Sequence, residues 1–121
     1  MYTPAKVTKK IGKESVTFYF GSGAFNIFCE HRGIELEEIQ EEFKKDKLGS
    51  LADILTSAAN FNLLVADKEA KYKRWHAFEW IDQISEKDLG DIMTTLEKVQ
   101  MLGQSLSGNG KSPTASRGRS K

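Results

Sequence analysis

The chain has 121 residues, of which 29% are charged and 39% hydrophobic, a composition typical of one compact domain rather than of a disordered chain. Its net charge is +1, but four positive charges lie near the C-terminus, at Lys111, Arg117, Arg119 and Lys121, so the rest of the chain is mildly acidic. This balance disfavours nucleic acid as a partner, because a nucleic-acid binder would carry a basic stripe on its folded part.

The cysteine content and hydropathy indicate where the protein resides. Cys29 is the single cysteine, so it has no intrachain disulfide partner, which favours a reducing compartment. No apolar run approaches the roughly 20 residues that span a bilayer, and the first residues lack the apolar stretch of a signal peptide. The sequence therefore predicts a cytosolic protein without a membrane partner.

The first predicted element is a β-hairpin. Val16, Phe18 and Phe20 alternate with polar or amphipathic residues, which is the period of a strand with one buried face. Residues 5–11 supply a second strand, and Gly12 suits the turn between the two. Because an isolated hairpin is marginally stable in water, its aromatic face must pack on the helices that follow.

Helical periodicity replaces the strand pattern after residue 23. Ser22 is the expected N-cap of a first helix, and Gly33 is its expected left-handed C-terminal residue. A second helix should lie at the surface with a solvated acidic face. Its inward residues are Leu36, Ile39 and Phe43, and its acidic residues are Glu35, Glu37, Glu38, Glu41 and Glu42. A third helix, rich in small residues, should begin at Ser50 after the helix breaker Gly49.

The fourth helix is expected over about 69–83, and the fifth begins at Ser85, where Ser85 and Asp88 resemble a capping box. From residue 104 the chain consists largely of Gly, Ser and basic residues, so it cannot offset the entropy of ordering. The predicted fold is mainly α, with an N-terminal β-hairpin packed on a compact bundle of about five helices and a disordered C-terminal tail. One folded domain spans 1–103, with the hairpin at about 5–20 and helices at about 23–103, and 104–121 form a flexible basic Gly/Ser tail.

Several short motifs resemble ligand-binding or catalytic sites but lack residues that such sites require. Gly108–Ser112 ends like a phosphate-binding loop, but the first glycine of that loop is missing and no strand precedes it. Gly21–Gly23 lacks the third glycine of a dinucleotide site, so a steric turn is favoured. His31 and His76 have no metal-ligand spacing, and Cys29 has no base to activate it. We expect no enzyme activity, no catalytic residue, no cofactor and no metal.

The aromatic residues of the fourth helix separate into two groups. Helical projection places Trp75, flanked by Tyr72, outside the arc that faces the core. These two residues either pack on the preceding loop or form part of a partner-binding surface, where Trp and Tyr are enriched. The residues of the core-facing arc are Ala77, Phe78, Trp80, Ile81 and Ile84.

One set of positions in the first third of the chain forms a recognisable pattern of apolar and glycine residues: Lys10–Lys13, Phe18–Gly21, Ala24, Phe25, Phe28, Glu30 and Gly33–Leu36. This pattern resembles the opening of the tail assembly chaperones of long-tailed bacteriophages and prophages. The resemblance continues more loosely through 51–65 and 86–102 and so covers nearly all of the predicted domain. The Lys- and Trp-rich segment from Lys68 to Trp80 departs from the family pattern, which leaves its role open.

The resemblance implies a non-enzymatic protein of the host cell cytoplasm that coats the tape measure protein and helps to recruit tail tube protein subunits during virion assembly. It leaves self-association open. The alternative is a small regulatory protein of a mobile element that binds nucleic acid through its basic tail.

Overall fold

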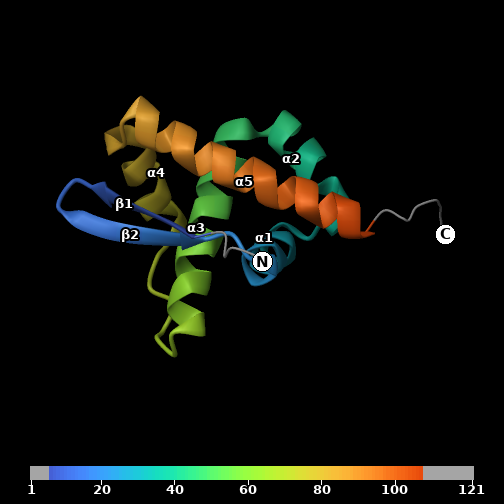
Figure 1. The fold of residues 1–121 in the computed structure, drawn as a ribbon, viewed down its shortest axis with the longest axis horizontal. Coiled ribbons are helices and arrows are strands. Elements are labelled where there is room, and N and C mark those ends of the chain that lie inside the picture. The colour runs from blue at the N-terminus through green and yellow to red at the C-terminus, as the bar shows by residue number, and fades with distance from the viewer. Residues whose placement is uncertain (1–5, 108–121) are drawn as a thin grey trace.

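The structure is a computed structural model that describes residues 6–107, with side chains placed for residues 6–98. It confirms a mainly α fold that opens with a β-hairpin (Figure 1). Helix α5 continues to Ser107 rather than ending at 103, and the remainder of the predicted tail, 108–121, lies outside the described residues. The elements are β1 (Lys6–Ile11), β2 (Glu14–Tyr19), α1 (Ser22–Arg32), the 3₁₀ turn η1 (Leu36–Glu38), α2 (Ile39–Lys45), α3 (Lys47–Val65), α4 (Arg74–Gln83) and α5 (Glu86–Ser107).

The hairpin forms as its alternating pattern predicts. Strands β1 and β2 pair antiparallel, and Gly12 takes a positive φ of 65° in the turn, which favours glycine. Val16, Phe18 and Phe20 are buried, and the ring of Phe18 meets that of Trp80 edge-on at 5.3 Å between centroids. The aromatic face of the hairpin therefore packs on the helices, as expected.

Helix α3 occupies the centre of the fold (Figure 1), where it packs against α1, α2, α4 and strand β2. Its small residues Ala52, Ala58 and Ala59 are buried and allow this close packing. By length and composition α3 could also cross a membrane, with a mean hydropathy of 1.3, but 56% of that window is buried inside the domain. The apolar composition of α3 is thus accounted for by its place in the core.

The start of α1 differs from the sequence prediction. Its N-cap is Gly21, not Ser22, and no side chain caps the first turn. A Cβ atom on Gly23 would lie 2.1 Å from the ring of Phe61, so a larger residue there would force the ring to move. Gly23 therefore permits the close packing of α1 against α3. The predicted end of the helix is confirmed, because Gly33 adopts the left-handed conformation with φ of 66°.

The start of α3 also lies earlier than predicted, at Lys47 rather than Ser50. The Asp46 carboxylate caps the helix by accepting the Gly49 N–H at 3.1 Å. A Cβ on Gly49 would clash with that carboxylate and with the Arg74 guanidinium, so glycine here serves the cap and does not break the helix. Ser50 is instead fully buried and donates to the Glu42 carbonyl at 3.0 Å.

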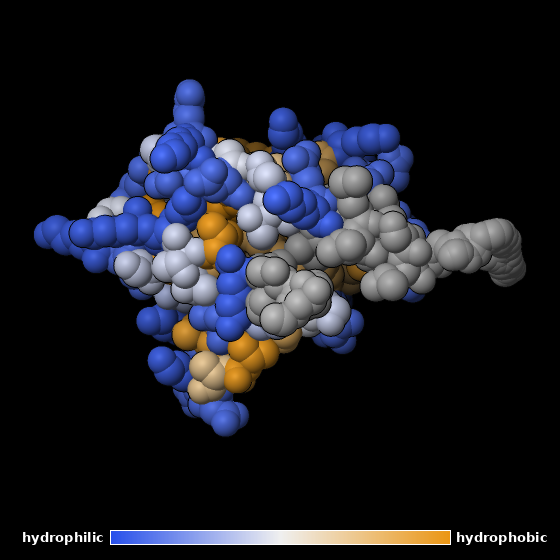
Figure 2. Space-filling view, viewed as in Figure 1, coloured by the Kyte–Doolittle hydropathy of each residue, from blue (hydrophilic) through white to orange (hydrophobic). Residues whose placement is uncertain are grey.

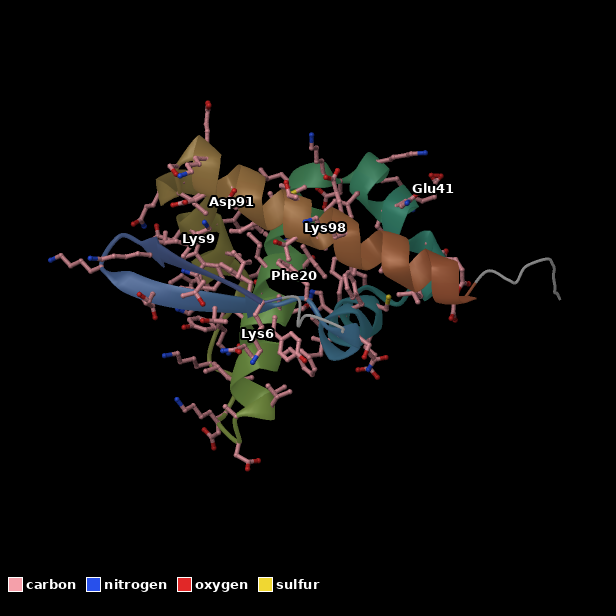
Figure 3. All side chains as sticks on the ribbon, in the orientation of Figure 1. Lys6, Lys9, Phe20, Glu41, Asp91 and Lys98 are labelled. Atoms are coloured by element: carbon pink, nitrogen blue, oxygen red, sulfur yellow. The ribbon has the colours of Figure 1, made fainter. Side chains whose placement is uncertain are left out.

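Ion pairs connect helix α5 to the hairpin. Lys9 Nζ on β1 lies 2.7 Å from the Asp91 carboxylate and 3.3 Å from that of Asp88 (Figure 3). Asp88 N–H donates to Ser85 Oγ at 3.1 Å, so Ser85 caps α5 as predicted. Lys9 and Asp91 lie side by side in Figure 3, and their ion pair fixes the hairpin against the first turns of α5.

Candidate protein-binding surface

Helix α4 has one buried face and one exposed stripe. Ala77 and Trp80 are buried, and the other predicted core residues of this helix are partly buried, which confirms the predicted arc. On the opposite side Trp75 keeps 61% of its surface exposed, and Glu79 and Asp82 are exposed four and seven residues further on. Because positions separated by four and seven residues share one side of a helix, these three side chains form a continuous outward stripe.

The indole of Trp75 does not pack into the domain. Its ring stacks on that of the adjacent His76, with centroids 3.8 Å apart and an angle of 23° between the planes. His76 is itself held in place, because its Nδ1 accepts the backbone N–H of Lys73 at 2.9 Å. Of the two alternatives left open for Trp75, the structure favours exposure at the surface over packing on the preceding loop, and its role in binding stays a prediction.

Tyr72, the second predicted binding residue, is half-buried and has clear structural contacts. The Asn60 side chain bonds both backbone groups of Tyr72 at 2.9 Å, accepting its N–H and donating to its carbonyl. The Tyr72 ring meets Trp80 edge-on at 5.0 Å, and its hydroxyl donates to Glu14 at 3.3 Å. Burial, followed by the charge of Glu14, raises the pKa of Tyr72. These contacts make Tyr72 a support for the surface, and its part in partner binding stays a prediction.

The same contacts explain why α4 begins later than predicted. The sequence predicts helix from about residue 69, whereas α4 starts at Arg74. Asn60 takes the backbone hydrogen bonds of Tyr72 that a helical turn would need, and Lys73 is extended with φ of −117°. Since Asn60 lies on α3, this interaction is set by tertiary structure and gives no local signal in the sequence.

A buried ion cluster beside α4 was missed by the sequence analysis. Asp53 on α3 is 6% exposed and binds two arginines, Arg32 Nη2 of α1 at 2.8 Å and Arg74 Nε of α4 at 2.8 Å. Arg32 also reaches Glu42 at 2.9 Å and Asp46 at 3.3 Å. The Asp53 carboxylate thus joins α1, α3 and α4, and Arg32 extends the cluster to Glu42 on α2. Its only sequence signal is an aspartate within the apolar α3.

This cluster corrects the prediction that all five carboxylates of the second helix form a solvated face. The side chain of Glu42 is only 15% exposed, and the Arg32 guanidinium beside it, with Lys45, holds its pKa below the usual range. The pKa of Asp46 is lowered by the Gly49 N–H and then by Arg32. These groups are paired with one another, an arrangement typical of structural ion pairs rather than of catalysis.

The charges on α4 run against its helix dipole. Three other helices follow the usual preference: α1 ends in His31 and Arg32, α2 has acids first and lysines last, and α5 begins with Glu86 and Asp88. Helix α4 has Arg74 in its first turn, no acid there, and Asp82 near its end. Each such charge–dipole contact is worth about 0.3–1 kcal/mol, so α4 gives up stability that its neighbours gain.

The other candidates from the sequence have structural explanations. Cys29 is buried, and burial, with the nearby Glu35 charge, raises the pKa of its thiol, which makes it a poor nucleophile. His31 is exposed on α1. Among the residues whose side chains are described, no group of three or more His, Cys, Asp or Glu could hold a metal ion. Gly108–Ser112 lies outside the described residues.

A second exposed apolar area lies at the end of α3. Leu64 and Val65 are 47% and 51% exposed there. In Figure 2 hydrophobic side chains gather at the lower end of the molecule, where α3 ends in Figure 1. The last turn of α3, residues 62–65, contains no charged residue, whereas charged residues surround Trp75.

Comparison of this chain with protein-family models, with curated proteins and with solved structures gives no match.

Proposed function

We propose that this protein is a non-enzymatic tail assembly chaperone of a long-tailed bacteriophage or prophage, acting in the host cell cytoplasm. Its partners would be the tape measure protein, which it binds, and the tail tube protein, whose subunits it helps to recruit. The family resemblance of residues 10–36 suggests this role. The observation that supports it best is Trp75, a large aromatic side chain left 61% exposed on a helix that is otherwise well packed.

The physical task of such a chaperone is to cover apolar surface on its client until tube subunits replace it. A rigid helical scaffold with an exposed aromatic anchor suits this task, because little order has to be gained on binding. The client would be a long, largely helical protein, bound by helix-in-groove or helix-on-helix contacts.

The test is co-expression with the tape measure protein, whose long gene is expected directly downstream. The proposal predicts that the tape measure protein stays soluble and co-purifies with this chain, and that it aggregates when expressed alone. Failure of the two to co-purify would contradict the proposal. Steeply salt-dependent binding to DNA in place of client binding would favour the regulatory alternative.

A further inference from the structure

The surface around the start of α4 combines basic side chains with the exposed Trp75, so it offers a partner charge as well as apolar contact. From Ala70 to Phe78 the chain contains no acidic residue, while Lys71, Lys73 and Arg74 are exposed beside Trp75. We call these four residues the basic–aromatic face. Within the part of the chain whose side chains are described, Lys71 and Lys73 form no ion pair. Their charge is therefore available to a partner.

The backbone that carries the basic–aromatic face is held in place by hydrogen bonds. Arg74 Nε is bound to Asp53 at 2.8 Å, and the Lys73 N–H is bound to His76 at 2.9 Å. Asn60 fixes the backbone of Tyr72 between the two lysines. A surface that is already ordered loses little conformational entropy on binding, which is a condition for a useful interface anchor.

The stripe that continues from Trp75 has the opposite charge, because Glu79 and Asp82 follow it along α4. Along the chain, the exposed residues therefore run from basic (Lys71 and Lys73, just before α4) through aromatic (Trp75) to acidic (Glu79 and Asp82). This order opposes the dipole of α4. Arg74 is paired with Asp53 inside the fold. Among the residues whose side chains are described, Lys73 at the N-cap and Glu79 and Asp82 further along form no ion pair. Charges that weaken their own helix without such a partner are expected where a surface serves binding.

We infer that this surface docks a protein segment of complementary order, with carboxylates facing the basic–aromatic face, an apolar side chain on Trp75, and a Lys or Arg facing Glu79 and Asp82. This inference rests on the proposed function, since it gives the chemistry of the client segment. A nucleic acid fits less well. The residues from 6 to 98 include 14 basic and 17 acidic side chains, a net charge of −3, and a uniform polyanion would meet Glu79 and Asp82.

The experiment uses the full-length chain and synthetic helical peptides. The test peptide carries Glu at one end, Leu at its centre and Lys at the other end, and a matched peptide has each Glu replaced by Lys. Binding is followed by Trp fluorescence and by isothermal titration. We expect the test peptide to bind at least about tenfold more tightly than the matched peptide, and added salt to weaken it.

Protein variants locate the site. Trp75→Ala and the pair Lys71→Glu with Lys73→Glu should each weaken binding of the test peptide by about tenfold or more. The pair Lys44→Glu with Lys98→Glu makes the same change in net charge on α2 and α5 (Figure 3 labels Lys98) and should leave binding unchanged. The inference would be overturned if the two double variants lost peptide affinity equally, or if the test peptide did not bind the wild-type protein.

Two further outcomes separate this inference from the proposed function. If the tape measure protein is captured equally well by wild type and by the Lys71→Glu and Lys73→Glu variant, the docking inference is wrong while the chaperone proposal stands. If the test peptide binds as expected but the tape measure protein is not captured, the chaperone proposal is wrong. Trp75-dependent binding of a single-stranded oligonucleotide, tighter than that of the test peptide, would overturn the choice of a protein partner.

Discussion

Trp75 and Trp80 lie on the same helix but in opposite environments, so they separate binding from stability. Trp75 is 61% exposed, whereas Trp80 is buried against Phe18 and Tyr72. We expect Trp75→Ala to change the free energy of unfolding by no more than about 0.5 kcal/mol. Trp80→Ala should cost about 3–5 kcal/mol. Urea unfolding measures both, and a loss for Trp75→Ala that approaches that for Trp80→Ala would show that Trp75 belongs to the core.

Two glycines in helices provide a matched test of packing. A Cβ on Gly23 would lie 2.1 Å from the Phe61 ring, whereas a Cβ on Gly90 would meet nothing within 4 Å. Gly23→Ala should therefore destabilise the domain by about 1–3 kcal/mol through overpacking. Gly90→Ala should stabilise it by about 0.5–1 kcal/mol, because alanine is the better helix former. Thermal unfolding of the two variants gives the sign directly, and the same sign for both would contradict the packing of α1 on α3.

Among the elements, α1, α3 and α4 depend on one carboxylate. Asp53 is almost fully buried between Arg32 and Arg74, and its neutralisation leaves both arginines without this partner. We expect Asp53→Asn to cost about 3–5 kcal/mol. The control is Glu41→Gln on α2, an exposed carboxylate (Figure 3) whose loss should cost less than about 0.5 kcal/mol. Similar unfolding midpoints for the two variants would show that the cluster does not hold the helices together.

The acid side of the stability profile follows from the carboxylates that join elements. Glu42, Asp46 and Asp91 have pKa values below their ordinary ones, mainly through Arg32, the Gly49 N–H and Lys9 respectively. Their stabilisation is complete above the ordinary pKa values and is lost as the pH falls through the lowered ones, because the unfolded chain then binds more protons. Stability should decline from about pH 5 downward, as urea unfolding at several pH values will show.

A control for this pH dependence is the Asp91→Asn variant, which removes one of these titrating groups. It should be less stable than wild type near pH 7 and should lose less stability on acidification. A wild-type protein that gains stability between pH 6 and pH 3 would contradict the assigned ion pairs.

The sequence predicts those elements whose signals are local. The alternation of Val16, Phe18 and Phe20 predicts the hairpin, Gly33 predicts the end of α1, and Ser85 predicts the start of α5. Features that depend on residues distant in the chain could not be predicted. Asn60 on α3 delays the start of α4. The start of α3 was wrong for a different reason: its cap, Asp46, is a local signal three residues from Gly49, but Gly49 was taken as a helix breaker.

The candidate surface follows the same division. Helical projection places Trp75 off the core arc, because that arc depends on residues of α4 alone. Projection could not show that Tyr72 is fixed by Asn60, nor that Glu42 turns inward to Arg32, since both contacts join different elements. The sequence shows the order of basic and acidic residues from 71 to 82. That this order opposes a helix dipole follows only from the bounds of α4.

For the molecule as a whole, we expect the folded domain to be independent of residues 108–121. Residues 108–121 lie outside the described structure, and their sequence offers no apolar face to bury. Deleting them should leave the midpoint of thermal unfolding unchanged. A markedly lower midpoint for the deletion variant would show that these residues contribute to the fold.

The most direct test of whether α4 presents the client-binding surface is an NMR titration of the ¹⁵N-labelled full-length chain with soluble peptides that cover successive segments of the tape measure protein. The account predicts that backbone amide shifts concentrate in residues 71–82, with the Trp75 indole signal among the most affected and the Trp80 indole little changed. The Trp75→Ala variant should bind more weakly, with resonance changes in the free protein limited to residues near the removed ring, such as His76. Shifts confined to the hairpin, or to the basic residues after 108, would contradict the claim that α4 presents the client-binding surface.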